Sequence, residues 1–269
     1  PEIRPPSIRG QLHWWFRALG GTARDEDAIF GSVHSQPVLA SKIVVRVSGA
    51  NDGNGSSPQK AEINTLPHKR GGEASPKWAF KPGTTFDLHL LERLGGLTDD
   101  QRQTCRRTLE AWLLAGTLGL RATRAGGSFI WHSLADDGIP MPGDVPAYSD
   151  RLTAVFNGAP LRVMLLKKSF SNAEAARHCV SDTLGGRDYP QDTNHLARLR
   201  DPLGRVFGGR KTSPLRFRIV KLGSGFHIVA TWDDRSAVTG NQPGDLKGII
   251  DLLANREKPV GDALRDICV

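Results

Sequence analysis

Three basic side chains recur at intervals of four residues near the start of the chain, at Arg9, His13 and Arg17. An α-helix turns once in about 3.6 residues, so this spacing places all three on one face, where they can contact phosphates. Trp14 lies beyond this row and offers an indole on which a base can stack. A solvated basic face is the plain alternative, but the segment has very few acids, which favours a nucleic-acid contact.

The segment around these residues has the signals of one short helix. Pro5 and Pro6 disfavour helix before Ser7, the Ser7 hydroxyl can accept from free backbone N–H groups, and Gly20-Gly21 end the helix. The N-terminus at Ser7 would also offer backbone donors to an anion. A second face is apolar and predicts burial in a core, with Ile8, Leu12, Trp15, Phe16 and Leu19.

Residues 119–128 form a glycine-rich, basic segment. Gly126 and Gly127 would let the backbone approach a phosphate closely, and Arg121 and Arg124 add positive charge. A structural interpretation also fits, in which Gly119 ends a helix and the glycine pair turns into a strand. The two interpretations are compatible. We therefore expect Arg121 and Arg124 to bind nucleic acid and to line one groove with the two arginines of the first helix.

Two further basic segments are weaker candidates. Arg210 and Lys211 follow Gly208-Gly209 and repeat the chemistry of residues 119–128 in the second half of the chain, so nucleic-acid contacts are expected there too. His68-Lys69-Arg70 lies in a long polar stretch, where a solvated loop is the simpler interpretation.

The chain offers little for catalysis. His13 is a candidate general base for metal-independent cleavage of RNA, but no second catalytic group accompanies it. Asp136-Asp137 and Asp233-Asp234 could hold magnesium, although paired aspartates in turns are usually only solvated. No Walker loop, dinucleotide fingerprint, HExxH or zinc pattern occurs. We therefore expect no metal, no cofactor and no catalytic residue.

Composition favours a nucleic-acid partner. The 269 residues carry a net charge of +8 with a pI near 9.7, and a basic protein gains free energy when it displaces counterions from phosphates. Three widely spaced cysteines, Cys105, Cys179 and Cys268, indicate neither a disulfide framework nor a zinc site, which fits a reducing cytoplasm. The most apolar run is too short to span a bilayer, so no membrane association is expected.

The elements that must position these residues follow a recurring order. In the first half we expect a polar linker over residues 20–27, strands over 40–47, 84–90 and 129–131, and a helix opening at Thr98 with capping-box spacing. Together with the first helix this gives the βαββαβ order of a ferredoxin-like domain without its first strand. That strand should lie upstream of Pro1.

The second half repeats this order. We expect a strand over 161–166, a helix opening at Ser171, strands over 215–220 and 226–231, and a final helix around 246–253. Phe30-Gly31 and Phe207-Gly208 open similar octapeptides ahead of a strand in each half, which favours a duplication. The predicted fold class is α+β, with two tandem ferredoxin-like (RRM-like) domains over residues 1–140 and 151–269. A linker would fall within 135–150.

Several motifs together resemble those of the RAMP superfamily. They are the run from Glu2 to Ala18, Phe30-Gly31-Ser32, Gly119 to Arg124 with its glycine tail, and Phe207-Gly208-Gly209. Within that superfamily the chain is most similar to the head-end subunits of type III-B (Cmr) CRISPR effector complexes. The family pattern leads us to expect arginine at the place of His13.

The resemblance implies two ferredoxin-like RAMP domains and an RNA-binding role in a cytoplasmic ribonucleoprotein of antiviral defence, without nuclease activity in this subunit. The partners it implies are CRISPR RNA, target RNA and other Cmr subunits. Two alternatives stay open. One is a metal-independent RAMP-type endoribonuclease that uses His13, and the other is a structural cap that touches RNA only incidentally.

Overall fold

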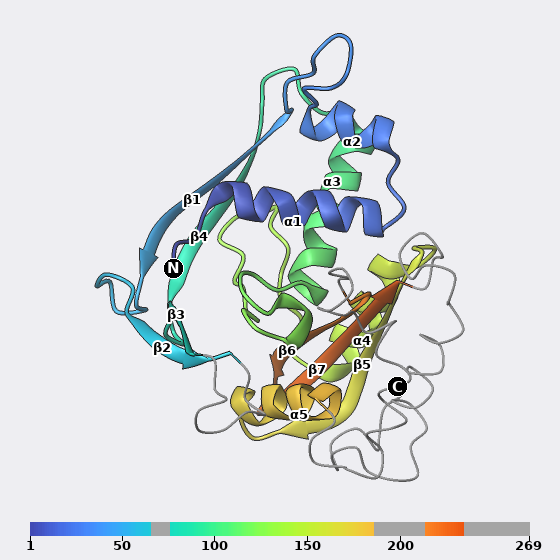
Figure 1. Ribbon diagram of the computed structural model, residues 1–269. Coiled ribbons are helices and arrows are strands. Elements are labelled where there is room, and N and C mark those ends of the chain that lie inside the picture. Colours follow the sequence, from blue (N-terminus) through green and yellow to red (C-terminus); the bar gives the residue numbers. More distant parts are fainter. Residues whose placement is uncertain (66–75, 186–212, 234–269) are drawn as a thin grey trace, which may run out of the picture. The chain divides into compact units, whose positions relative to one another are not determined.

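The computed structural model describes residues 1–65, 76–185 and 213–233, which fall into two compact units (Figure 1). The first unit comprises residues 1–65 and 76–112, and the second holds the described residues from Leu113 onward. Both units combine helices with antiparallel strands, so the predicted α+β class is confirmed. Within the described ranges, every helix falls short of the length and apolarity needed to cross a membrane.

Helix α1 (Pro5–Ala18) begins earlier than the sequence predicts. Pro5 and Pro6 occupy its first two positions, where an N–H would have no partner within the helix, and Arg4 rather than Ser7 is the N-cap. The predicted cap at Ser7 is therefore wrong. Gly20, with φ of 96°, follows the helix end as expected. The apolar face is also confirmed, because its first four members are at most 1% exposed: Ile8, Leu12, Trp15 and Phe16.

Helix α2 (Ala23–Phe30) occupies the segment predicted as a polar linker. Thr22 caps it by accepting the Asp25 backbone N–H at 3.2 Å, and acidic residues in the first turn complement the helix dipole. Ile29 and Phe30 are buried. A single apolar pair at the end of eight residues is too little to reveal a helical period, which is why the linker prediction was wrong.

Two antiparallel strand pairs complete the first unit. Strand β1 (Ile43–Asn51) pairs with β4 (Thr85–Glu92). Strand β2 (Lys60–Asn64), in the long polar stretch expected to be a loop, pairs with β3 (Pro76–Phe80). Helix α3 (Asp99–Ala115) follows. Its predicted capping box is confirmed, since Gln101 N donates to Thr98 Oγ1 at 3.3 Å and Thr98 N donates to Gln101 Oε1 at 3.2 Å.

The second unit is built on a three-stranded antiparallel sheet of order β5-β7-β6. Its elements are the 3₁₀ turn η2 (Ala122–Arg124), α4 (Val145–Phe156), β5 (Leu161–Phe170), α5 (Ala173–Gly185), β6 (Leu215–Leu222) and β7 (Gly225–Asp233). Helix α5 packs Ala176, Cys179 and Val180 against Phe217 and Ile228 of the sheet. This strand order is the one expected for the first three strands of a ferredoxin-like domain.

Two predictions for this part of the chain are wrong. Residues 129–131 form no strand; Trp131 Nε1 donates to the Ile139 carbonyl at 2.8 Å, and Ile130 is 53% exposed. Helix α4 begins within the expected linker, capped by Asp144, which accepts the Ala147 N–H at 2.8 Å. The tandem ferredoxin-like arrangement therefore stays a prediction. The helix expected at 246–253 lies outside the described residues.

Candidate nucleic-acid interface

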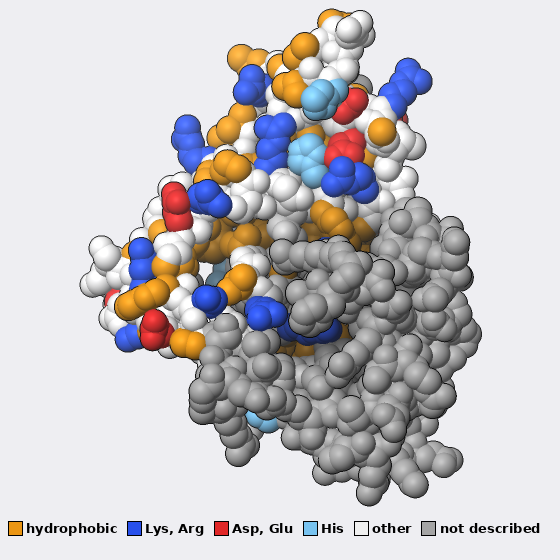
Figure 2. Space-filling view, in the orientation of Figure 1, with side chains coloured by type: hydrophobic (Ala, Val, Ile, Leu, Met, Phe, Trp, Pro, Cys, Tyr) orange, Lys and Arg blue, Asp and Glu red, His pale blue; other side chains and the backbone are white. Residues whose placement is uncertain are grey.

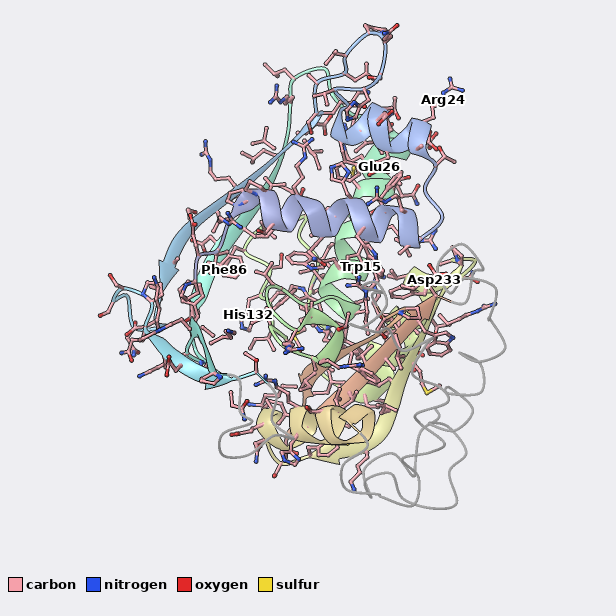
Figure 3. All side chains as sticks on the ribbon, viewed as in Figure 1. Trp15, Arg24, Glu26, Phe86, His132 and Asp233 are labelled. Atoms are coloured by element: carbon pink, nitrogen blue, oxygen red, sulfur yellow. The ribbon has the colours of Figure 1, made fainter. Side chains whose placement is uncertain are left out.

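The basic side chains of α1 meet an acid from α2. Glu26 is 8% exposed, and its Oε1 lies 2.6 Å from His13 Nδ1 and 3.3 Å from Arg17 Nη1, between the two helices (Figure 3). Arg9 donates through Nη2 to the Phe30 carbonyl. Basic side chains, histidine and acidic side chains therefore lie side by side on the surface of the first unit (Figure 2). The side chain of Arg17 is 58% exposed, so it is the member of this row most open to an outside phosphate.

Both ring nitrogens of His13 are engaged. A guanidinium N–H can only donate, so Arg9 Nε, 3.4 Å away, makes His13 Nε2 the acceptor. The proton of the neutral ring then lies on Nδ1 and is donated to Glu26. The ring also packs on Phe30, with centroids 4.5 Å apart. These contacts make His13 part of the packing between α1 and α2.

Two other expectations for α1 concern its N-terminus and Trp14. The two prolines have no N–H, and the Ser7 N–H donates to the Arg4 carbonyl at 3.0 Å, so the predicted anion site at this helix N-terminus is wrong. Trp14 is half-buried and packs edge-on against Trp15, with ring centroids 4.9 Å apart. Its expected stacking on a base stays a prediction.

The glycine-rich segment folds into a tight loop in the second unit. Arg121 (φ 61°) and Ala125 (φ 60°) adopt the left-handed conformation on either side of η2, which costs about 1 kcal/mol or more for residues that carry a Cβ. Leu118 N donates to the Gly127 carbonyl at 2.9 Å. A Cβ on Gly127 (φ 72°) would come 1.6 Å from the Leu118 carbonyl oxygen. The loop's own backbone therefore requires glycine at this position.

A buried arginine holds both ends of this loop. Arg218 of β6 is fully buried, and its Nη1 donates to the Gly116 carbonyl at 2.6 Å while its Nη2 donates to the Phe129 carbonyl. The guanidinium carbon lies 4.4 Å from the ring centroid of Phe129 and 5.7 Å from that of Trp131. Burial lowers the pKa of Arg218, and Tyr148 offsets part of that shift. The loop is thus fixed to the edge strand of the sheet.

Arg121 and Arg124 are carried on this fixed loop. Arg121 is exposed and Arg124 half-buried. Burial lowers the pKa of Arg124 to about 10, and the neighbouring charge of Arg121 contributes to the shift. Among the described residues, no carboxylate forms an ion pair with either. Unlike the row on α1, these cations have no acid paired with them among the described residues.

The remaining predictions concern basic residues elsewhere in the chain, a shared groove and metal sites. Arg210, Lys211 and His68-Lys69-Arg70 lie outside the described residues. Arg9 and Arg17 belong to the first unit and Arg121 and Arg124 to the second, so their shared groove stays a prediction. Over the described part of the chain, no group of three or more His, Cys, Asp or Glu side chains is arranged to hold a metal ion.

Sequence reasoning missed Glu26 and Arg218. The N-cap pattern of Thr22 and Asp25 was the available signal for α2, and with it for an acid facing α1. Arg218 alternates with apolar residues in its strand, a pattern that predicts a solvent-facing side chain. Nothing local in the sequence indicates its burial.

Residues 1–130 match the model of the RAMP superfamily, which confirms the resemblance indicated by the motifs. The chain is also 28% identical to CRISPR system Cmr subunit Cmr1-1 of Pyrococcus furiosus, in an alignment of 154 residues that covers 48% of this chain. The alignment spans only 40% of the length of that relative.

Two solved structures share the fold. One is the apo crystal structure of Cmr1 from Pyrococcus furiosus, with a TM-score of 0.56 and 19% identity over 86% of this chain and 80% of that one. The other is a chain of the type III-B Cmr-beta complex bound to cognate target RNA, with a TM-score of 0.53 and 11% identity over 86% of this chain and 88% of that one.

Proposed function

We propose that this chain is an RNA-binding subunit of a cytoplasmic CRISPR type III (Cmr-like) ribonucleoprotein, in contact with guide RNA, target RNA or both and with other Cmr subunits. The observation that carries the proposal is the loop fixed by Arg218, which presents Arg121 and Arg124 with no acid from the described parts of the chain paired to them. The fold shared with a chain of a Cmr complex that was solved on target RNA supports the choice of ligand.

The chemistry at these residues suits phosphate contact without base readout. Guanidinium groups give bidentate, charge-assisted hydrogen bonds to phosphate oxygens, and each contact releases counterions from the strand. Such contacts position an RNA but carry no sequence information. Sequence specificity would then come from pairing between guide and target.

The enzyme alternative requires His13 to take a proton from an RNA hydroxyl. Its Nε2 faces Arg9 at 3.4 Å and its Nδ1 faces Glu26 at 2.6 Å, so neither ring nitrogen is open to a substrate in this arrangement. We therefore propose a binding role rather than catalysis. Metal-free cleavage of labelled RNA that disappears in His13→Ala would contradict this.

Salt-dependent RNA binding tests the proposal directly. We expect the affinity of the purified chain for single-stranded RNA to fall steeply with salt, and Arg121→Gln to reduce the slope of log K against log salt by about 0.7. Arg17→Gln tests the α1 row with the same measurement, and we expect a smaller change in slope because Glu26 already pairs with Arg17. Arg24→Gln on the exposed face of α2 is its control. Absence of RNA binding, or purification from its host without RNA or other Cmr subunits, would refute the proposal.

A further inference from the structure

A third arginine lies beside the loop. Helix α5 packs against η2, and Ala125 and Ala176 belong to the same buried cluster. Ala125 directly follows Arg124 in the loop, and Ala176 directly precedes Arg177 in the helix. The packing of α5 on η2 places Arg177 on the helix that lies against the loop.

Arg121 acts on both of the other arginines. The positive charge of Arg121 lowers the pKa of both Arg124 and Arg177, in addition to the larger effect of burial on each. Glu174, one turn earlier on α5, raises the pKa of Arg177 and so neutralises part of the cluster. Arg124 also has a buried Nη1 that, within the described residues, has no hydrogen-bond acceptor.

An anion would relieve this arrangement. Like charges held together, and a guanidinium nitrogen without an acceptor among the described residues, both raise the free energy of this cluster. A phosphate supplies negative charge and several acceptor oxygens in the geometry that guanidinium groups prefer. The frame is already rigid, because Arg218 fixes the loop and Ala125 is packed in the core. Little further ordering is then needed for binding.

We propose that Arg121, Arg124 and Arg177 form a phosphate-binding site between the 119–128 loop and helix α5, and that it holds one phosphodiester of the bound RNA. The identity of the ligand as RNA rests on the function proposed above, whereas the phosphate site itself rests on the three side chains. Arg177 is the new member, and it lies 53 residues beyond Arg124 in the sequence.

The test compares Arg177→Gln with Arg162→Gln, an exposed arginine of β5 in the same unit. We expect Arg177→Gln to weaken binding of single-stranded RNA about 10-fold and Arg162→Gln less than about 2-fold. Inorganic phosphate at constant ionic strength should raise the thermal unfolding midpoint of the wild-type chain and of Arg162→Gln, but not of Arg177→Gln. Arg177→Lys should restore part of both effects, since it keeps the charge.

The outcomes separate the two proposals. If Arg177→Gln binds RNA and responds to phosphate as Arg162→Gln does, while Arg121→Gln weakens RNA binding, the three-arginine site is refuted and the RNA-binding function stands. If phosphate stabilises the wild-type chain through Arg177 but RNA does not bind, the site stands as one for free phosphate or a small phosphorylated ligand, and the RNA function is refuted.

Discussion

Replacing Arg218 with methionine keeps much of the side chain's length and removes its charge and all of its donors. The Gly116 and Phe129 carbonyls lose their partner, at about 1–3 kcal/mol each, and the cation–π contact with Phe129 contributes about 2 kcal/mol more. The burial of Arg218 opposes this loss, because desolvating its cation costs several kcal/mol. We expect a net loss of about 2–4 kcal/mol in the free energy of unfolding.

Urea unfolding measures the stability, and hydrogen exchange locates the effect. The Ile219 N–H donates to Ser128 Oγ at 2.9 Å, so this amide reports whether the loop stays on β6. The Leu118 N–H donates to the Gly127 carbonyl at 2.9 Å and reports whether the loop keeps its own conformation. Both should lose protection in Arg218→Met well below the global unfolding transition. RNA affinity should fall at least as far as in Arg121→Gln, although Arg218 itself is buried.

Arg162→Met serves as the control, because an exposed strand residue should change stability by less than about 0.5 kcal/mol. If Arg218→Met unfolds within 0.5 kcal/mol of that control, with the two loop amides as well protected as in the wild type, Arg218 does not hold the loop. The account of the candidate site would then have to be abandoned.

Three further outcomes follow from single contacts. Glu26→Gln removes the carboxylate beside Arg17, so binding of RNA should tighten about 2-fold or more if that arginine contacts phosphate, and stability should drop by about 1 kcal/mol. Gly127→Ala should destabilise the protein by more than about 2 kcal/mol in urea, since its Cβ would lie 1.6 Å from the Leu118 oxygen. Burial raises the pKa of Cys105 to about 11, so alkylation at pH 8 should be at least 10-fold slower than in urea.

Each of these three predictions can be contradicted by one result. Unchanged RNA affinity in Glu26→Gln would remove Arg17 from the interface. A stable Gly127→Ala protein would mean that the loop relaxes without difficulty. Equal alkylation rates in buffer and urea, followed at Cys105 by mass spectrometry, would contradict its burial. The rate should rise with pH up to about 11, because the thiolate is the reacting form.

The sequence predicts best where the cause is local. The capping box of α3 rests on two residues three apart, and the buried face of α1 rests on the helical period. Both signals lie within one turn or one helix. The strand expected at 129–131 does not form, and Phe129 and Trp131 instead contact Arg218, which lies 89 and 87 residues further on. No pattern within three residues can reveal such a contact.

The sequence predicted the basic residues of α1 but not the acidic residue that pairs with them. The spacing of Arg9, His13 and Arg17 does place them on one face, but the acid that pairs with two of them comes from a helix read as a linker. Charge on one element is visible in the sequence, whereas neutralisation by a neighbouring element depends on tertiary packing. A basic helical row is for this reason weaker support for a phosphate site than its charge suggests.

The two sets of cations therefore differ in what an RNA must displace. A phosphate that approaches α1 competes with the Glu26 carboxylate, already 3.3 Å from Arg17, so part of its electrostatic gain goes into breaking an existing pair. A phosphate at the loop meets Arg121 and Arg124 without such a competitor among the described residues. Counterion release at the loop then adds to affinity in full. The loop should accordingly account for most of the salt dependence of RNA binding, and α1 for little of it until Glu26 is replaced.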